Sequence, residues 1–145
     1  KLIKYFFVLS LFIFCLILFF ISLTDRYLFY LIIFISFFND TVAYLSGRFF
    51  AGKLIIPSIS PNKTWSGTLI SFFATSFILL LLNFSILLSM ISAISLFLGD
   101  IFFSFVKRFL QIKDFSASLG GHGGILDRLD SMFLLAIIFQ IYLVF

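Results

Sequence analysis

Two carboxylates three residues apart, Asp127 and Asp130, are the side chains of this sequence whose spacing most directly indicates chemistry. At the start of a helix, such a pair lies on one face with Cβ atoms about 5–6 Å apart. Mg²⁺ is usually bound by one or two carboxylates together with substrate phosphates. Alternatively, Asp127 caps the helix and Asp130 stabilises its first turn. Arg128 between them, and the basic segment before them, favour a phosphate-binding metal site.

A third carboxylate, Asp100, lies within the apolar run SLFLGDIFFSFV. An Asp at the centre of a membrane helix costs about 2.5–3.5 kcal/mol on the insertion scale. Such a residue is therefore a functional-site hypothesis. Helical spacing places Ser104 and Lys107 on the same face. The structural alternative is an ion pair or a protonated carboxyl between helices.

The same reasoning applies to Asp40, which lies near the end of an earlier apolar stretch. In a helix, Asp40, Tyr44 and Gly47 share one face, and Asn39 is adjacent. A substrate-binding role and an interfacial polar cluster both remain open for Asp40.

A basic, glycine-rich segment leads into Asp127. Glycines let the backbone approach an anion, and the following helix directs its positive N-terminus to the same place. Basic anchors at the membrane surface explain the cations alone, but not the carboxylates among them. His122, the one histidine, either serves a phosphate or hydrogen-bonds within its own loop. The candidate site residues of this segment are Lys107, Arg108, Lys113, Asp114, His122, Gly123 and Gly124.

A second polar segment contains Ser60-Pro61-Asn62-Lys63-Thr64-Trp65. Ser-Pro predicts a helix cap followed by proline at the first helical position. Trp65 suits the headgroup level of a bilayer. Lys63 and Thr64 either contact phosphate or anchor the chain at the lipid surface.

The elements that position these residues are apolar helices. The chain is 63% hydrophobic and 11% charged, against roughly 45–50% and 25% in soluble domains. Five stretches approach the roughly 20 residues needed to span a bilayer. We therefore expect an all-α, polytopic integral membrane protein with a single membrane domain over residues 1–145. The stretches cover residues 2–23, 27–46, 67–82, 84–106 and 129–145, and Asn83 predicts a tight helical hairpin.

Two helices separate the polar segments 47–66 and 107–128, so both segments are expected on one side of the membrane. With the N-terminus inside, nine of the ten basic residues lie on that side and Arg26 alone lies outside. This distribution follows the positive-inside rule. The net charge of +4 is therefore a topology feature, and no nucleic-acid partner is expected.

The segment from Ser104 to Asp130 carries a long motif: a Ser, Lys-Arg, Lys-Asp, His-Gly-Gly and Asp-Arg-x-Asp at fixed spacings. This motif resembles the signature of the phosphatidate cytidylyltransferase family, here at about 99–131. Gly99-Asp100, NDTVAYLSGRFFAGK and SPNKTW extend the resemblance over about 39–131.

The resemblance implies that CTP and phosphatidate react to give CDP-diacylglycerol and pyrophosphate. It also implies Mg²⁺ with a second cation such as K⁺, held by Asp100, Asp127 and Asp130. The implied catalytic residues are Lys107, Arg108, Lys113, Asp114, His122 and Arg128. The expected substrate-binding residues are Asp40, Ser60, Lys63, Thr64, Ser104, Gly123 and Gly124.

The apolar spans and the distribution of basic residues predict a multi-pass membrane protein with its site facing the cytoplasm, and the many Phe and Ile residues indicate a bacterial inner membrane. We also expect a homodimer. Members are longer, which predicts further helices before this chain. Gly120-Gly121 replaces the usual Pro-Gly. The alternatives are a CTP-dependent lipid-alcohol kinase, a small channel or transporter using Asp40 and Asp100, and an inactive remnant that binds lipid or partners.

Overall fold

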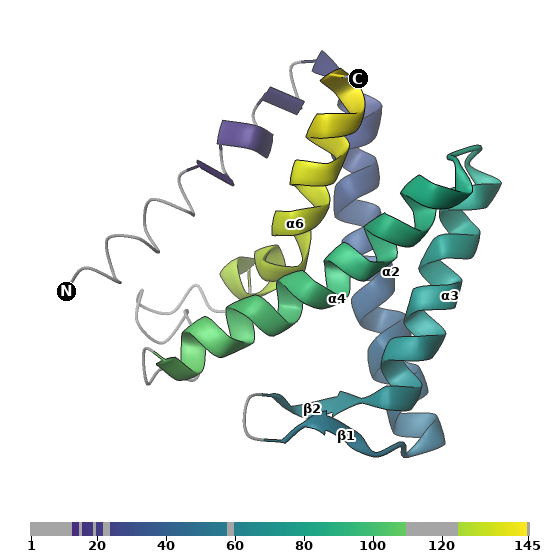
Figure 1. The fold of residues 1–145 in the computed structure, drawn as a ribbon, viewed down its shortest axis with the longest axis vertical. Helices are drawn as coiled ribbons and strands as arrows, with labels where there is room; N and C mark the ends of the chain where they lie inside the picture. The colour runs from purple at the N-terminus through teal and green to yellow at the C-terminus, as the bar shows by residue number, and fades with distance from the viewer. Residues whose placement is uncertain are drawn as a thin grey trace.

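Four long helices and one two-stranded hairpin make up most of the described part of the chain (Figure 1). The computed structural model describes residues 13–14, 16–18, 20–21, 24–57, 60–109 and 125–144, with the backbone alone at 61–62 and 125–130. The elements are α2 (Arg26–Phe50), β1 (Leu54–Ile56), β2 (Ser60–Thr64), α3 (Trp65–Leu81), α4 (Ile86–Phe109) and α6 (Ile125–Val144).

Helix α2 begins at a cap and ends four residues beyond its expected end at residue 46. The Asp25 carboxylate accepts hydrogen bonds from the backbone N–H groups of Tyr27 and Leu28, at 2.9 and 3.3 Å. Ala51 adopts a left-handed conformation (φ 43°) and terminates the helix. The extension carries the helix past Gly47, which the sequence places in a polar loop.

Helices α2 and α3 cross in very close contact. A Cβ added to Gly67 would lie 2.5 Å from the Ala43 carbonyl oxygen, and one added to Gly47 would lie 2.7 Å from Thr64 Oγ1. Small residues at such a crossing let two backbones approach, as is common between membrane helices. The crossing fixes the start of α3 against the end of α2.

The hairpin between α2 and α3 was not expected, and it corrects the interpretation of Ser60. Strands β1 and β2 pair antiparallel, with Leu54 opposite Thr64 and Ile56 opposite Ser60. Ser60 is therefore a strand residue, and the prediction that it caps a helix is wrong. Thr64 is the cap of α3, since its hydroxyl accepts from Gly67 N–H at 3.2 Å.

The turn between α3 and α4 confirms the helical hairpin expected at Asn83. Asn83 has a φ of 65°, a left-handed conformation that asparagine tolerates better than most residues. Phe84 N–H donates to the Leu79 carbonyl at 3.1 Å, which closes the end of α3. The two helices therefore run antiparallel.

The burial pattern is unlike that of a soluble protein. Large apolar side chains such as Tyr30 and Phe73 are 67% and 66% exposed. Small polar side chains are buried together with the apolar core: Ser36, Asn39, Ser71, Thr75, Ser76, Ser89, Ser92, Ser95 and Ser131. Small and hydroxyl-bearing residues between helices, with apolar residues outside, are typical of helices packed in a lipid bilayer.

An apolar cluster lies where α2, α4 and α6 meet. Ile35, Leu96, Leu135 and Phe139 are fully buried there. The rings of Phe103 and Phe133 lie 5.4 Å apart and join α4 to α6 at one end of the cluster. These contacts set how α6 lies against the helices that carry the candidate site.

Within the described residues, α2 and α4 are long and apolar enough to cross a membrane, while α3 and the segment Ser131–Val144 are shorter apolar helices. The expected first span, residues 2–23, lies mostly outside the described residues. The hairpin and the C-terminal end of α4 lie toward the same end of the molecule in Figure 1. Most of the second polar segment, residues 107–128, lies outside the described residues, so a shared side of the membrane stays a prediction.

Candidate active site

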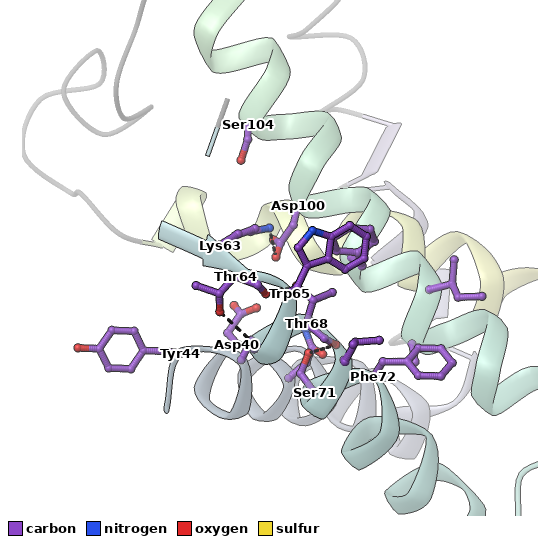
Figure 2. A pocket seen from close by; sticks show the side chains of 17 residues that line it. Asp40, Tyr44, Lys63, Thr64, Trp65, Thr68, Ser71, Phe72, Asp100 and Ser104 are labelled. Atoms are coloured by element: carbon purple, nitrogen blue, oxygen red, sulfur yellow. Dashed lines mark hydrogen bonds and ion pairs between the residues drawn. The ribbon is translucent and has the colours of Figure 1, made fainter. Parts of the chain in front are cut away.

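A cavity of about 670 Å³ lies between α2, β2, α3 and α4 (Figure 2). Its volume falls within the usual range for a small-molecule site. The polar residues that line it are Asn39, Asp40, Tyr44, Lys63, Thr64, Thr68, Ser71, Asp100 and Ser104. The cavity thus brings together five of the residues expected to bind substrate or metal: Asp40, Lys63, Thr64, Asp100 and Ser104.

Lys63 and Asp100 form an ion pair in this cavity. The Lys63 Nζ atom lies 2.5 Å from Asp100 Oδ2, and the two side chains are 26% and 19% exposed. Asp100 thus has a partner from β2, which helical spacing along its own element does not reveal. Ser104 lines the same cavity one turn further along α4, as expected (Figure 2).

Asp40 enters the cavity from α2. Next to it, Asn39 is buried and its amide oxygen accepts a hydrogen bond from Thr75 Oγ1 at 3.3 Å. This bond fixes α2 against α3 beside Asp40. The sequence shows Asn39 only as a polar neighbour of Asp40, and nothing in it indicates Thr75 as the partner.

The rest of the cavity wall is apolar. It is formed by Ala43, Trp65, Gly67, Leu69, Phe72, Ala93, Ile94 and Phe97. Figure 2 shows the Lys63–Asp100 pair in one part of the hollow and Phe72 in another. The cavity is therefore amphipathic, with charged groups and an apolar wall in one space. Sequence reasoning missed the apolar wall because 25 phenylalanines obscure any pattern.

The start of α6 is placed by two contacts. The hydroxyls of Ser36 and Ser131 share a buried hydrogen bond of 2.6 Å, and Phe133 packs on Phe103. Helices α2 and α6 run antiparallel (Figure 1). One turn after Ser36 on α2 is Asp40, and one turn before Ser131 on α6 is Asp127. The register therefore brings these two positions to the same level.

The remaining expected site residues are only partly described. Asp127, Arg128 and Asp130 lie in the first two turns of α6, where the backbone alone is described. Since α6 begins at Ile125, Asp127 is inside the helix and the alternative of a cap at Asp127 is wrong. Lys107 and Arg108 lie in the last turn of α4. Lys113, Asp114, His122, Gly123 and Gly124 lie outside the described residues.

The donor atoms of the cavity fit a hard cation such as Mg²⁺, which prefers oxygen ligands. Asp40, Asp100 and Ser104 supply carboxylate and hydroxyl oxygens, and Asp100 already faces a cation, the Lys63 ammonium. Among the described side chains, no three His, Cys, Asp or Glu residues gather in one place. Any set of three protein carboxylates at this site therefore needs at least one of Asp114, Asp127 and Asp130, whose side chains are outside the described ones.

The fold and the cavity define a helical, membrane-associated protein with a carboxylate- and lysine-lined site. The sequence matches the profile of the cytidylyltransferase family over residues 1–145. The chain belongs to this family.

Curated relatives support the same assignment. A phosphatidate cytidylyltransferase of Rickettsia conorii is 34% identical over 131 residues, which cover 79% of this chain and 57% of the relative. One of Aquifex aeolicus is 39% identical over 120 residues, covering 78% and 46%. Phosphatidate cytidylyltransferase 4, chloroplastic, of Arabidopsis thaliana is 36% identical over 103 residues, covering 64% and 26%. This chain spans about half the length of the bacterial relatives.

Proposed function

We propose that this chain carries the reaction site of a phosphatidate cytidylyltransferase, which joins CTP and phosphatidate into CDP-diacylglycerol and pyrophosphate. The observation that carries the proposal is the amphipathic cavity. Lys63, Asp100 and Ser104 meet Phe72 and Phe97 within one space. A lipid phosphate needs both kinds of surface: cations and hydroxyls for its head, and apolar side chains for its glycerol and acyl groups.

The reaction is a displacement at the α-phosphorus of CTP. A phosphatidate oxygen forms the new P–O bond, and the bond to the β-phosphate oxygen breaks. The electron pair leaves on pyrophosphate. The phosphatidate oxygen is already anionic at neutral pH, so the chain needs to supply orientation and counter-charge rather than a strong base.

The residues of the chain would then have different roles. Cationic Lys107, Arg108, Lys113 and Arg128 would hold phosphate oxygens, with the backbone of Gly123 and Gly124 and the side chains of Ser60, Lys63, Thr64 and Ser104 assisting. Asp114 and His122 belong to the same signature segment. Asp100, Asp127 and Asp130 would hold Mg²⁺, with a second cation such as K⁺, and Asp40 would border the substrate. When bound, Mg²⁺ would orient the phosphates and neutralise the departing pyrophosphate.

We further propose a multi-pass protein of the bacterial inner membrane with the cavity opening to the cytoplasm, where CTP is available. The outward-facing apolar side chains and the concentration of basic residues on the hairpin side support this orientation. A homodimer stays a prediction, which the mass of the purified protein in detergent tests.

Product analysis tests the proposal. Membranes containing the full-length protein are incubated with labelled CTP, phosphatidate and Mg²⁺, and the lipids are separated. Labelled CDP-diacylglycerol is the expected product. A phosphorylated lipid alcohol with release of CDP would instead indicate the kinase alternative, and no labelled lipid from intact protein would reject the proposal.

A further inference from the structure

Lys63 reaches Asp100 from an element that is separate from the carboxylate's own helix. Its backbone is held by the pairing of β2 with β1, and the next two residues anchor the start of α3. Trp65 N–H donates to the carbonyl of Lys53, the residue before β1, at 3.0 Å, which ties this junction to the start of the hairpin. The backbone of Lys63 is thus fixed, while its four-carbon side chain keeps several rotamers.

The Lys63 side chain borders two hollows. Besides the main cavity, it lines a small recess formed with Ile55, Ile56, Ser60 and Ile101. The methylenes of lysine are stable against apolar surface while the ammonium stays in a polar space. The stem of Lys63 thus lies beside the apolar side chains that line the recess. Rotation about its single bonds lets the ammonium turn from Asp100 toward other groups in the main cavity.

A place for an anion lies next to this ammonium. Thr64 caps α3, and Trp65, Gly67 and Thr68 from the first turn of α3 line the main cavity. The N-terminus of a helix carries a partial positive charge that favours a phosphate. A phosphate oxygen at this end of α3 would therefore attract the Lys63 ammonium away from the Asp100 carboxylate.

We propose that Lys63 is an exchangeable counter-cation for Asp100. Before nucleotide arrives, its ammonium neutralises the carboxylate. When a divalent cation arrives with a nucleoside triphosphate, the cation takes the carboxylate and Lys63 moves to a phosphate oxygen. This proposal rests on the proposed function, because it assumes that Asp100 serves a metal–nucleotide complex.

The exchange gives Lys63 opposite effects on two binding events. Two cations beside one carboxylate repel each other, so Lys63 weakens the binding of a free divalent cation. The same ammonium strengthens the binding of the cation–nucleotide complex, because it gains a phosphate partner. Lys63 therefore couples metal binding to nucleotide binding, and couplings of this kind are typically about 5- to 150-fold.

The test measures binding without turnover. The full-length protein in phosphatidylcholine nanodiscs is titrated with Mn²⁺ alone, and the electron paramagnetic resonance signal of free Mn²⁺ measures how much remains unbound. A separate titration uses the Mn²⁺–CTP complex. Lys63→Met is expected to bind free Mn²⁺ about tenfold more tightly and Mn²⁺–CTP about tenfold more weakly. Lys63→Gln should behave like Lys63→Met, and Lys63→Arg should stay near the wild type for free Mn²⁺.

Lys53→Met is the matched control, since Lys53 is an exposed lysine beside the same hairpin and does not line the cavity. It should change neither affinity. Asp100→Asn should weaken both. Unchanged free Mn²⁺ affinity in both neutral variants at Lys63, or a shift of the two affinities in the same direction, would overturn the proposal.

These outcomes are separate from the outcome for the reaction. If the opposite shifts appear but the wild-type protein makes no CDP-diacylglycerol, the proposed reaction is rejected and the exchange stands. If the product forms but the shifts are absent, the exchange is rejected and the reaction stands.

Discussion

Ser36 of α2 and Ser131 of α6 share a buried hydrogen bond of 2.6 Å, although they lie 95 residues apart in the chain. The two helices run antiparallel (Figure 1). Asp40 lies one turn after Ser36 and Asp127 one turn before Ser131, so the bond brings these two positions to the same level. The bond therefore connects the described cavity with the helix that begins the Asp-Arg-x-Asp motif.

The Ser36–Ser131 bond predicts a measurable coupling. Ser36→Ala and Ser131→Ala each leave one buried hydroxyl without this partner, so the double variant should lose less stability than the sum of the two. Hydrogen bonds between membrane helices average about 0.6 kcal/mol and reach about 1.7 kcal/mol. A double-mutant cycle of unfolding free energies checks this. Additive losses would show that the two hydroxyls do not interact.

Asp100→Asn should abolish most of the activity while leaving the fold intact. The amide keeps the size of the side chain but removes the charge that holds a cation. We expect a loss of at least about 100-fold in kcat/KM, as for other groups that stabilise charge in a transition state. Initial rates with CTP and phosphatidate give the result, and size-exclusion profiles verify the fold.

Asp25→Asn is the matched control for that variant. Asp25 caps α2 and lines neither cavity described here, and asparagine caps helices as well as aspartate. Activity should be unchanged. An equal loss of activity in both variants would indicate a general effect of removing a carboxylate.

Ala93→Phe should reduce the affinity for phosphatidate and not that for CTP. Ala93 is 2% exposed on α4 and lines the apolar wall of the cavity, so a ring at this position fills space assigned to the lipid. We expect KM for phosphatidate to rise about tenfold, the equivalent of about 1.4 kcal/mol of lost binding. Leu98→Phe, at an exposed position on the same helix, should leave both KM values unchanged. A selective rise in KM for CTP would place the nucleotide against this wall instead.

The proposed topology predicts which positions a membrane-impermeant thiol reagent reaches. Cys15 is the one native cysteine, so Cys15→Ser provides a clean background. In intact cells, Leu82→Cys at the α3–α4 turn should react, whereas Lys53→Cys beside the hairpin should react only after the membrane is opened. The reverse pattern would place the cavity on the outer side.

The sequence predicted those features whose physical cause is local. Asp100 stands out because a charge in an apolar run is costly, and the structure places it in a cavity. Asn83 marks the helical hairpin because it is the one polar residue between two apolar runs. In both cases, one polar or charged residue lies among apolar neighbours in the sequence.

Features that depend on distant partners could not be predicted. The hairpin was missed because its strands, Leu54–Ile56 and Ser60–Thr64, are too short to show alternation, and Ser-Pro equally fits a helix start. The Lys63–Asp100 pair was missed because it joins a strand to a helix. Spacing along one element identifies neighbours on that element alone.

The most direct test of the central claim follows the two ends of the CTP triphosphate. The full-length protein is supplied with phosphatidate and CTP labelled separately at the α- and γ-phosphorus. We predict that the α label enters the lipid in one-to-one proportion with the CDP-diacylglycerol formed, that the γ label is released as pyrophosphate, and that Asp100→Asn prevents both. Transfer of the γ label to lipid, or product formation unaffected by Asp100→Asn, would contradict the account.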